Sequence, residues 1–382
     1  MKTIKDVLSD GFWIMPSTPQ FIENGEIPYI TSKNIKISNI DFSNVEYISK
    51  EDFEEISKNR PIKVNDMLIS MIGTLGNIAI VKETDGSFYG QNMYLLRLNS
   101  DVIDRDYFYH FFNSDVVKRH IESRKNKSTQ GYLKANHIEE IAIPVPSMEE
   151  QKEIASHFEA INSLIDARKE QLEKLDLLVK SQFIELFGDY DLSHAQSGWK
   201  AISEIGRVVG GATPKTNIEE YWDGEYRWIT PAELVADNGY IYDSVRKLTK
   251  AGVDSCSLQE MPVNTVILSS RAPIGKVAIA GNTFYCNQGF KNIVCNESII
   301  PRYLYTILLL NTEYLNSLGR GATFKEISKS IVENIKIPVP SVELQEQFTT
   351  FVEQTDKSKL AVQQSLEKFE TLKKSLMQQY FG

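Results

Sequence analysis

The chain has 382 residues and a net charge of −9, and 42% of its residues are hydrophobic and 24% charged. This usage is ordinary for a soluble globular protein, and the length exceeds what one hydrophobic core usually organises, so we expect at least two domains. No stretch approaches the roughly 18 apolar residues that cross a bilayer, and Asp6 and Asp10 stand where a signal peptide needs an apolar run, which indicates a cytoplasmic protein.

Residues 1–146 combine strand and helix patterns. Alternating apolar residues beside glycines at 67–81 are typical of strands, whereas residues 105–121 carry apolar side chains at helical spacing, so we expect an α+β domain. Its turns hold polar side chains that could touch bases, and the amides among them could pair bidentately with adenine. These candidates are Thr74, Asn77, Gln91 and Asn92. Each one alone is more often a turn former or a solvated loop residue.

A basic strip lies between residues 118 and 134, where six basic residues face only one acidic residue, Glu122. Lysine and arginine at such density can contact the phosphates of DNA. The candidates in this strip are Lys118, Arg119, Arg124, Lys125, Lys127, Thr129 and Gln130.

Residues 147–188 predict a long helix. Ser147 can cap it, with Glu150 completing a capping box, and Gly188 supplies a stop. A helix of about 40 residues would be ~60 Å long. Its apolar residues follow the 4-3 spacing of a coiled coil, interrupted at Arg168 and Gln182. This coiled-coil stripe consists of Ile154, Phe158, Ile161, Ile165, Leu172, Leu175, Val179 and Leu186.

Residues 189–340 repeat the layout of the first domain. Thr213-Pro214 corresponds to Thr18-Pro19, and 266–280 corresponds to 67–81, with offsets that vary between 194 and 199 residues. We therefore expect a second, similar α+β domain. Its candidate DNA-binding residues stand at matching joints, which favours a shared role. They are Arg271, Lys276, Asn287, Gln288, Lys291, Arg320, Thr323 and Lys325.

Residues 341–382 predict a second long helix, whose stripe is Phe348, Val352, Val362, Leu366, Phe369 and Leu376. Residues 143–188 and 337–382 align without a gap, and 17 of the 46 pairs are identical, so the chain is a tandem duplication. A long one-sided helix needs a partner for its apolar stripe, and the other copy, paired antiparallel, is the obvious one. The alternative is that each helix packs only on its own domain.

The charge is unevenly distributed along the chain. Residues 1–146 carry −3, 147–190 carry −5, 191–340 carry 0 and 341–382 carry −1. The acidic first helix is therefore better suited to meet protein than DNA, whereas the two domains remain open to DNA.

The whole chain resembles the specificity subunit of a type I restriction-modification system. The resemblance lies in the duplicated domains, in IPVPSMEEQ (143–151) and IPVPSVELQ (337–345), and in the helix endings LFG (186–188) and YFG (380–382). It implies target-recognition domains at 1–146 and 189–340 and spacer helices at 147–188 and 341–382. It also implies a split double-stranded DNA target, two methyltransferase partners and, in some assemblies, a restriction subunit.

The residues indicate no catalysis by this chain itself. The [N/D]PP[Y/F] tetrapeptide of DNA adenine methyltransferases is absent, GK at 275–276 lacks the rest of a phosphate loop, and the five histidines form no metal-ligand pair on a helix face. The three cysteines show no CxxC spacing. We therefore expect no metal and no cofactor on this chain, with S-adenosylmethionine and ATP on the partners that the resemblance implies. The rival hypothesis is a structural coiled-coil adaptor whose end domains bind proteins.

Overall fold

The computed structural model describes every residue except 1, 24, 125–131, 189, 235–238 and 322–324. Its contacts divide the chain into two compact units: unit 1 is Met1–Arg168 with Ser365–Gly382, and unit 2 is Lys169–Gln364. Each unit therefore takes part of both long helices.

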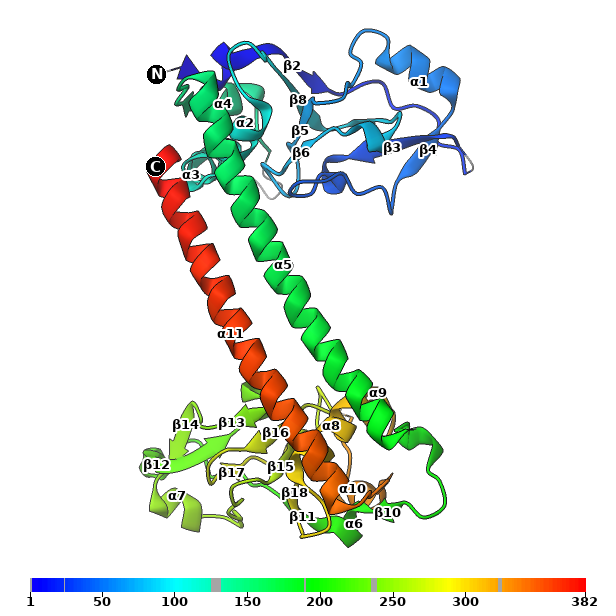
Figure 1. The fold of residues 1–382 in the computed structure, drawn as a ribbon, viewed down its shortest axis with the longest axis vertical. Coiled ribbons are helices and arrows are strands. Elements are labelled where there is room, and N and C mark those ends of the chain that lie inside the picture. Colours follow the sequence, from blue (N-terminus) through cyan, green and yellow to red (C-terminus); the bar gives the residue numbers. More distant parts are fainter. Residues whose placement is uncertain (1, 24, 125–131, 189, 235–238, 322–324) are drawn as a thin grey trace. The chain divides into compact units, whose positions relative to one another are not determined.

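Unit 1 contains two sheets and a short strand pair (Figure 1). The first sheet is antiparallel, in the order β2 (Leu8–Ile14), β8 (Met93–Leu98), β5 (Met67–Ser70) and β6 (Ile78–Ile80). In the second sheet, β3 (Ile27–Thr31) pairs with β4 (Glu46–Ile48) and, in parallel, with β7 (Tyr89–Gln91). The remaining elements are β1 (Lys2–Thr3), β9 (Ala142–Ile143), α1 (Lys50–Ser57), α2 (Arg105–Phe112), α3 (Asp115–Arg124) and α4 (Ala135–Glu139).

The first sheet of unit 1 separates two cores, because successive side chains of a strand point to opposite faces. Met67 and Ile69 pack in the core that α2, α3 and the long helices share, whereas Leu68, between them, packs in the core under the second sheet. The alternation in β5 thus makes this strand part of both cores of the unit.

Unit 2 repeats this topology. Its larger sheet has the order β11 (Gly206–Gly210), β18 (Lys291–Cys295), β15 (Val266–Leu268), β16 (Val277–Ala280) and β13 (Tyr240–Ile241). Its smaller sheet has the order β14 (Arg246–Leu248), β12 (Trp222–Ile229) and β17 (Tyr285–Cys286). The remaining elements are β10 (Lys200–Ala201), β19 (Lys336–Ile337), α6 (Ile202–Ile205), α7 (Lys250–Asp254), α8 (Pro301–Leu310), α9 (Thr312–Ser317) and α10 (Lys329–Asn334). Strand β13 is an addition at the sheet edge, and the expected pair of similar α+β domains is confirmed.

The two long helices are α5 (Met148–Phe187) and α11 (Val342–Phe381), each of 40 residues. Within unit 1, Phe158 near the start of α5 stacks on Phe381 at the end of α11, with ring centroids 5.7 Å apart. Within unit 2, Phe183 near the end of α5 meets Phe348 near the start of α11 at 5.3 Å. The start of each helix therefore pairs with the end of the other, which confirms the antiparallel coiled coil.

The stripe residues divide by burial. Those that are buried are Ile154, Phe158, Ile161, Ile165, Phe348, Val352, Val362 and Leu366. Those that are half-buried are Leu172, Leu175, Val179, Leu186, Phe369 and Leu376. The stripe inferred from the sequence omits Phe183 and Phe381, both buried. A straight α-helix drifts about 20° per heptad against a strict seven-residue repeat, so side chains just outside the expected stripe can enter the interface.

The repeated motifs meet inside each unit. In unit 1 the Tyr107 hydroxyl donates to the Pro144 carbonyl at 2.9 Å, and its ring lies 5.4 Å from that of Phe381. In unit 2 the Tyr303 hydroxyl donates to the Pro338 carbonyl at 3.0 Å, and Phe187 lies 4.8 Å from the Tyr303 ring. One tyrosine in each unit thus contacts both the IPVP segment before one long helix and the Phe-Gly ending of the other.

Among the residues that the structure describes, no helix combines the length and the apolar character needed to cross a membrane.

Candidate nucleic-acid interface

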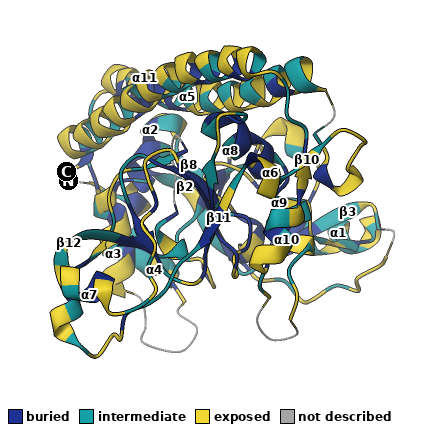
Figure 2. Ribbon diagram, turned by 90° about the horizontal axis from the view of Figure 1, so that it is seen from below, coloured by how far each residue is buried: buried dark blue, intermediate teal, exposed yellow. Residues whose placement is uncertain are grey.

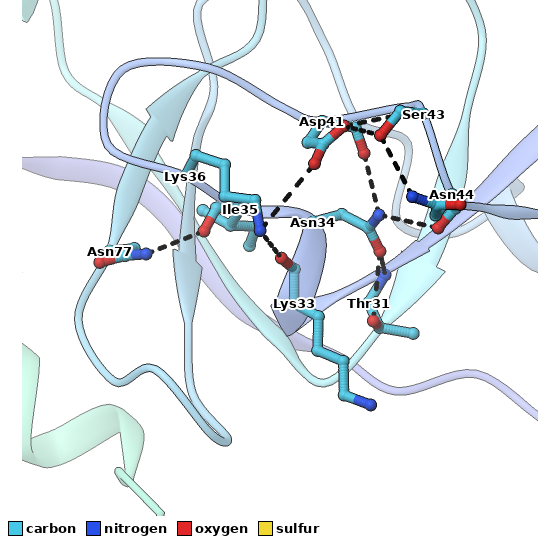
Figure 3. A network of polar contacts seen from close by, with 9 residues as sticks. All are labelled: Thr31, Lys33, Asn34, Ile35, Lys36, Asp41, Ser43, Asn44 and Asn77. Atoms are coloured by element: carbon cyan, nitrogen blue, oxygen red, sulfur yellow. Dashed lines mark hydrogen bonds and ion pairs between the residues drawn. The ribbon is translucent and has the colours of Figure 1, made fainter. Parts of the chain in front are cut away.

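In unit 1, three loops meet beside the end of β5. The Ser32 hydroxyl accepts a hydrogen bond from the Met71 amide at 3.1 Å and donates to the Asn92 carbonyl. The Asn77 side chain, in the turn between β5 and β6, donates to the Ile35 carbonyl at 3.0 Å (Figure 3). The turn that carries Thr74 and Asn77 is therefore fastened to the loop that follows β3, a segment to which the sequence assigns no role.

The loop after β3 is held in shape by Asn34. This buried side chain accepts from the Thr31 amide at 2.9 Å and donates to the Asp41 carbonyl at 2.9 Å (Figure 3). The ammonium of the exposed Lys36 donates to the Lys33 carbonyl at 2.8 Å. Lys33 is also exposed and, among the described residues, makes no ion pair. Unit 2 has the corresponding bond, since the Thr230 amide donates to Glu233 Oε1 at 2.9 Å as the Thr31 amide does to Asn34.

A pocket of about 250 Å³ brings together two candidates from separate segments, Asn77 and Lys118. Its complete lining is Ile37, Leu75, Gly76, Asn77, Phe112, Asn113, Lys118, Ile121 and Glu122. Gly76 is required there, because its φ is +80° and an added Cβ would lie 2.8 Å from the Ile121 side chain. The turn and α3 thus approach each other closely enough to form one surface.

The remaining basic candidates of unit 1 belong to α3 and the segment after it. Arg119 and Arg124 are exposed on α3, and the Arg119 Nε donates to the Asp115 carbonyl at 3.2 Å. Lys125, Lys127, Thr129 and Gln130 lie outside the described residues. The described chain resumes at Tyr132, which forms an isolated antiparallel bridge with Ile72 in the turn between β5 and β6.

Several of the amide candidates already take part in local hydrogen bonds. Asn92 has a φ of +63°, and its main-chain amide donates to the Ile14 carbonyl at 2.9 Å. The Asn287 side chain accepts from the Gly289 amide at 2.9 Å, and the Gln288 side chain accepts from the Thr213 hydroxyl at 2.5 Å. Gln91 is half-buried in β7. Asn92 and Asn287 thus act as turn formers.

In unit 2, the turn between β15 and β16 is joined to the segment that precedes α10. Arg271 donates from Nε to Glu326 Oε2 at 2.9 Å, and Lys291 from β18 reaches Glu326 Oε1 at 3.1 Å. Burial by itself raises the pKa of Glu326, but the hydrogen bonds and positive charges of these two residues outweigh it, and the pKa lies below its ordinary value. Glu326 is therefore an ionised bridge between two candidate residues.

The other candidates of unit 2 differ in their surroundings. Arg320 forms a main-chain bridge with Glu326 and is exposed, as is Lys325. Lys276 is half-buried, and its amide donates to the Ser269 hydroxyl at 2.9 Å. Thr323 lies outside the described residues. The structure thus joins two sequence candidates, Arg271 and Lys291, through one carboxylate that sequence reasoning missed.

The turns of the two units share one design. In unit 1 the Ser70 hydroxyl donates to the Thr74 carbonyl and accepts from the Asn77 amide at 2.9 Å. In unit 2 the Ser269 hydroxyl donates to the Pro273 carbonyl at 2.8 Å and accepts from the Lys276 amide. The scaffold is common, and the side chains it displays differ.

No group of His, Cys, Asp and Glu suited to a metal ion occurs among the described residues. Burial raises the pKa of the Cys286 and Cys295 thiols to about 12, so both are protonated packing residues at neutral pH. The arrangement offers cations, amides and hydroxyls on rigid loops, which is the chemistry of binding phosphates and base edges.

A family model described as the type I restriction modification DNA specificity domain matches residues 1–177 and, a second time, residues 196–370. The chain therefore belongs to that family, and the resemblance expected from the sequence is confirmed. The two matches divide the chain as its internal duplication does.

Named relatives agree with this assignment. The MjaIX specificity subunit of Methanocaldococcus jannaschii is 41% identical over 185 residues, which are 47% of this chain and 43% of that protein. The putative MjaX specificity subunit of the same organism is 25% identical over 99% of this chain and 90% of that protein. This chain thus aligns with less than half of the first relative and nine tenths of the second.

Two solved structures have the same fold over nearly the whole chain. A chain from a structure of a type I R-M system superposes with a TM-score of 0.63 at 18% identity, covering 99% of this chain and 96% of that one. The S subunit from M. genitalium superposes with a TM-score of 0.58 at 15% identity, covering 100% and 95%.

Proposed function

We propose that this chain is the DNA-specificity subunit of a type I restriction-modification complex and recognises a two-part double-stranded DNA target. The observation that carries the proposal is that a DNA-specificity domain is present twice, on the same scaffold but with different side chains at the turns. Two domains that display different groups would read different half-sites.

In unit 1, the DNA surface would consist of the turn between β5 and β6, the loop after β3, and α3. Lys33, Lys118 and Arg124 are exposed there and suited to phosphates, while Thr74 and Asn77 stand at the turn. In unit 2, the turn between β15 and β16, together with Arg320 and Lys325, would serve the same purpose. Loops on a rigid sheet are the usual place for such residues.

We propose that methyltransferase subunits dock on α5 and α11. Much of α5 and α11 is coloured as exposed in Figure 2. Several large apolar side chains on these helices are exposed, with 61% exposure at Leu177 and 60% at Leu360. Others of this kind are Leu164, Leu178, Ile184 and Leu372. Exposed apolar side chains mark an interaction surface where they form a contiguous patch. The acidic Glu159, Glu170 and Glu173, all exposed, would flank the contact.

The chemistry in this proposal belongs to the partners. S-adenosylmethionine and ATP would bind to methyltransferase and restriction subunits, and this chain would contribute only recognition and assembly.

The DNA proposal is tested by the salt dependence of binding in the assembled complex. Measured by fluorescence anisotropy with a labelled duplex that carries the target, log K should fall linearly with log salt concentration, because each phosphate contact releases counterions. An adaptor that binds only proteins would show no such dependence and no affinity for the duplex.

The docking proposal is tested by reversing charge at Glu159, Glu170 and Glu173 to lysine together. The triple variant should copurify with less methyltransferase subunit than the unchanged chain. A matched variant with Glu46, Glu54 and Glu55 changed to lysine alters the same charge outside the long helices and should copurify normally. Equal yields from both triple variants would contradict the assignment.

A further inference from the structure

Arg271 is held in one orientation by both its main chain and its side chain. It lies in the turn between β15 and β16, with 47% of its side chain exposed. Its backbone forms an antiparallel bridge with Glu326, and the neighbouring Ile327 amide donates to the Ser270 carbonyl at 2.9 Å. The Nε atom of Arg271 donates to Glu326 Oε2 at 2.9 Å.

Glu326 is itself fixed. Its second oxygen accepts from the Lys291 ammonium at 3.1 Å, and this ammonium also lies 3.2 Å from the Ser270 hydroxyl. The Lys291 side chain is only 13% exposed and belongs to the first residue of β18 in the larger sheet. Because each carboxylate oxygen has its own cationic partner, the carboxylate cannot rotate without losing one of them.

This arrangement leaves the end of the guanidinium available. Among the described residues, neither Nη atom of Arg271 has a hydrogen-bond partner. The guanidinium is planar, so fixing Nε also fixes the plane of the two Nη groups. Two parallel N–H donors in a fixed plane match the O6 and N7 acceptors of guanine in the major groove. A side chain that is already ordered loses less conformational entropy when it binds.

The equivalent position in unit 1 has different chemistry. There the bridge joins Ile72 to Tyr132, and the Leu133 amide donates to the Met71 carbonyl at 3.1 Å, as Ile327 does to Ser270. The main-chain framework is therefore the same in both units, while an apolar and aromatic pair replaces the arginine and glutamate. A position that differs on a common framework is suited to decide which bases each unit reads.

We propose that Arg271 reads a guanine in the half-site recognised by unit 2, and that Glu326, supported by Lys291, is the positioning residue that orients it. This inference rests on the proposed DNA-recognition function. It assigns base readout to one fixed arginine and leaves phosphate contacts to the exposed Arg320 and Lys325, whose side chains have no ion pair among the described residues.

The test uses the complete complex of this chain with methyltransferase subunits and S-adenosylmethionine, acting on a plasmid library of random sequence. Methylated sites are then mapped by single-molecule sequencing. In Arg271→Gln, the preference for guanine at one base pair of one half-site should fall by about 5- to 150-fold, the discrimination of one bidentate pair. The preference should shift toward adenine, because a glutamine amide can pair bidentately with adenine. The other half-site should stay unchanged.

Glu326→Gln serves as the second variant, because it preserves the size of the side chain while removing the charge that anchors Arg271. It should lose part of the guanine preference at the same base pair. The matched control is Arg227→Gln in the same unit, since the Arg227 Nε also pairs with a carboxylate, Asp243, at 3.2 Å but lies on β12. The control should keep the original motif.

The outcomes separate the inference from the function on which it rests. If the unchanged complex methylates no two-part motif, the proposed function fails and the inference fails with it. If it does, but Arg271→Gln weakens binding equally at all sequences and lowers the salt slope by about one, Arg271 contacts a phosphate and the inference is wrong. If the Arg271→Gln chain does not assemble with the methyltransferase subunits, Arg271→Lys and Glu326→Gln replace it in the test. An unaltered methylation motif in both of these variants would overturn the inference.

Discussion

At the scale of single residues, one buried glutamine fastens each long helix to its domain. Gln151 donates from Nε2 to the Pro146 carbonyl at 2.9 Å, and its Oε1 accepts from the Asp104 amide at 2.8 Å. Gln345 makes the same two bonds, to the Pro340 carbonyl at 2.9 Å and from the Ile300 amide at 2.8 Å. This geometry explains why the glutamine of IPVPSxExQ stands in both copies.

Replacing this glutamine by leucine should destabilise unit 1. Gln151→Leu leaves buried main-chain groups without partners, and each such group costs about 1–3 kcal/mol. We expect an earlier unfolding transition in urea, followed by near-UV circular dichroism. Gln363→Leu, at an exposed position of α11, makes the same chemical change and should shift the transition by less than about 0.5 kcal/mol. Equal shifts for both variants would show that the hydrogen bonds of Gln151 contribute nothing.

His110 makes the stability of unit 1 depend on pH. Burial beside Phe158, together with the charge of Lys373, lowers the pKa of His110 from 6.5 to about 4. The folded state therefore keeps this histidine neutral while the unfolded chain takes up a proton, so its contribution is complete above pH 6.5 and is lost as the pH falls toward 4.

His110→Gln should flatten the decrease in stability between pH 6.5 and pH 4, by up to about 3 kcal/mol at the acid end. Urea unfolding measured across this range provides the check. His157→Gln, at an exposed position of α5, is the control and should retain the slope. An unchanged slope in His110→Gln would mean that His110 takes up its proton equally in both states.

At the scale of elements, the end of each long helix completes a core built mostly by other segments. In unit 1, Phe381 packs on Tyr107, Phe111 and Phe158 with ring centroids 5.4 to 5.7 Å away. The last turn of α11 thus packs against core residues that lie more than two hundred positions earlier in the sequence. The Phe-Gly ending is a packing motif, and after α5 its glycine, Gly188, has a φ of +69° that stops the helix.

Phe381→Ala should therefore destabilise unit 1, because removing a buried phenylalanine costs about 3–5 kcal/mol. Amide hydrogen exchange followed by mass spectrometry should show faster exchange in α2 and in the end of α11. The comparison is Leu372→Ala on the same helix, where the side chain is 47% exposed and exchange should change little. Protection of α2 that is the same in both variants would contradict the packing role of Phe381.

At the scale of the whole molecule, both long helices run without interruption from one unit into the other in sequence. We expect the length of the paired helices to set the gap between the two half-sites of the target. Two heptads add ~21 Å to an α-helix and preserve the phase of a coiled coil.

Inserting two heptads at matched points of both helices, between Leu164 and Leu172 and between Ser358 and Leu366, should lengthen the gap and leave both half-sites intact. Methylome sequencing of a strain that expresses this variant measures the gap directly. An insertion in one helix alone puts the two stripes out of register and should abolish methylation. Active protein that still modifies the original spacing would refute this prediction.

The sequence by itself determined the duplication, the two long helices, the α+β class of the domains and the family, because these depend on periodicity and on repeated local motifs. It did not reveal Glu326, Ser32 or Gln151 as structural centres, since each forms a hydrogen bond with a residue 35 to 60 positions away. Phe183 and Phe381 were likewise recognisable as core only in the fold. Tertiary structure decided these points because a hydrogen bond or a ring contact depends on distance in space, which local spacing along a chain does not specify.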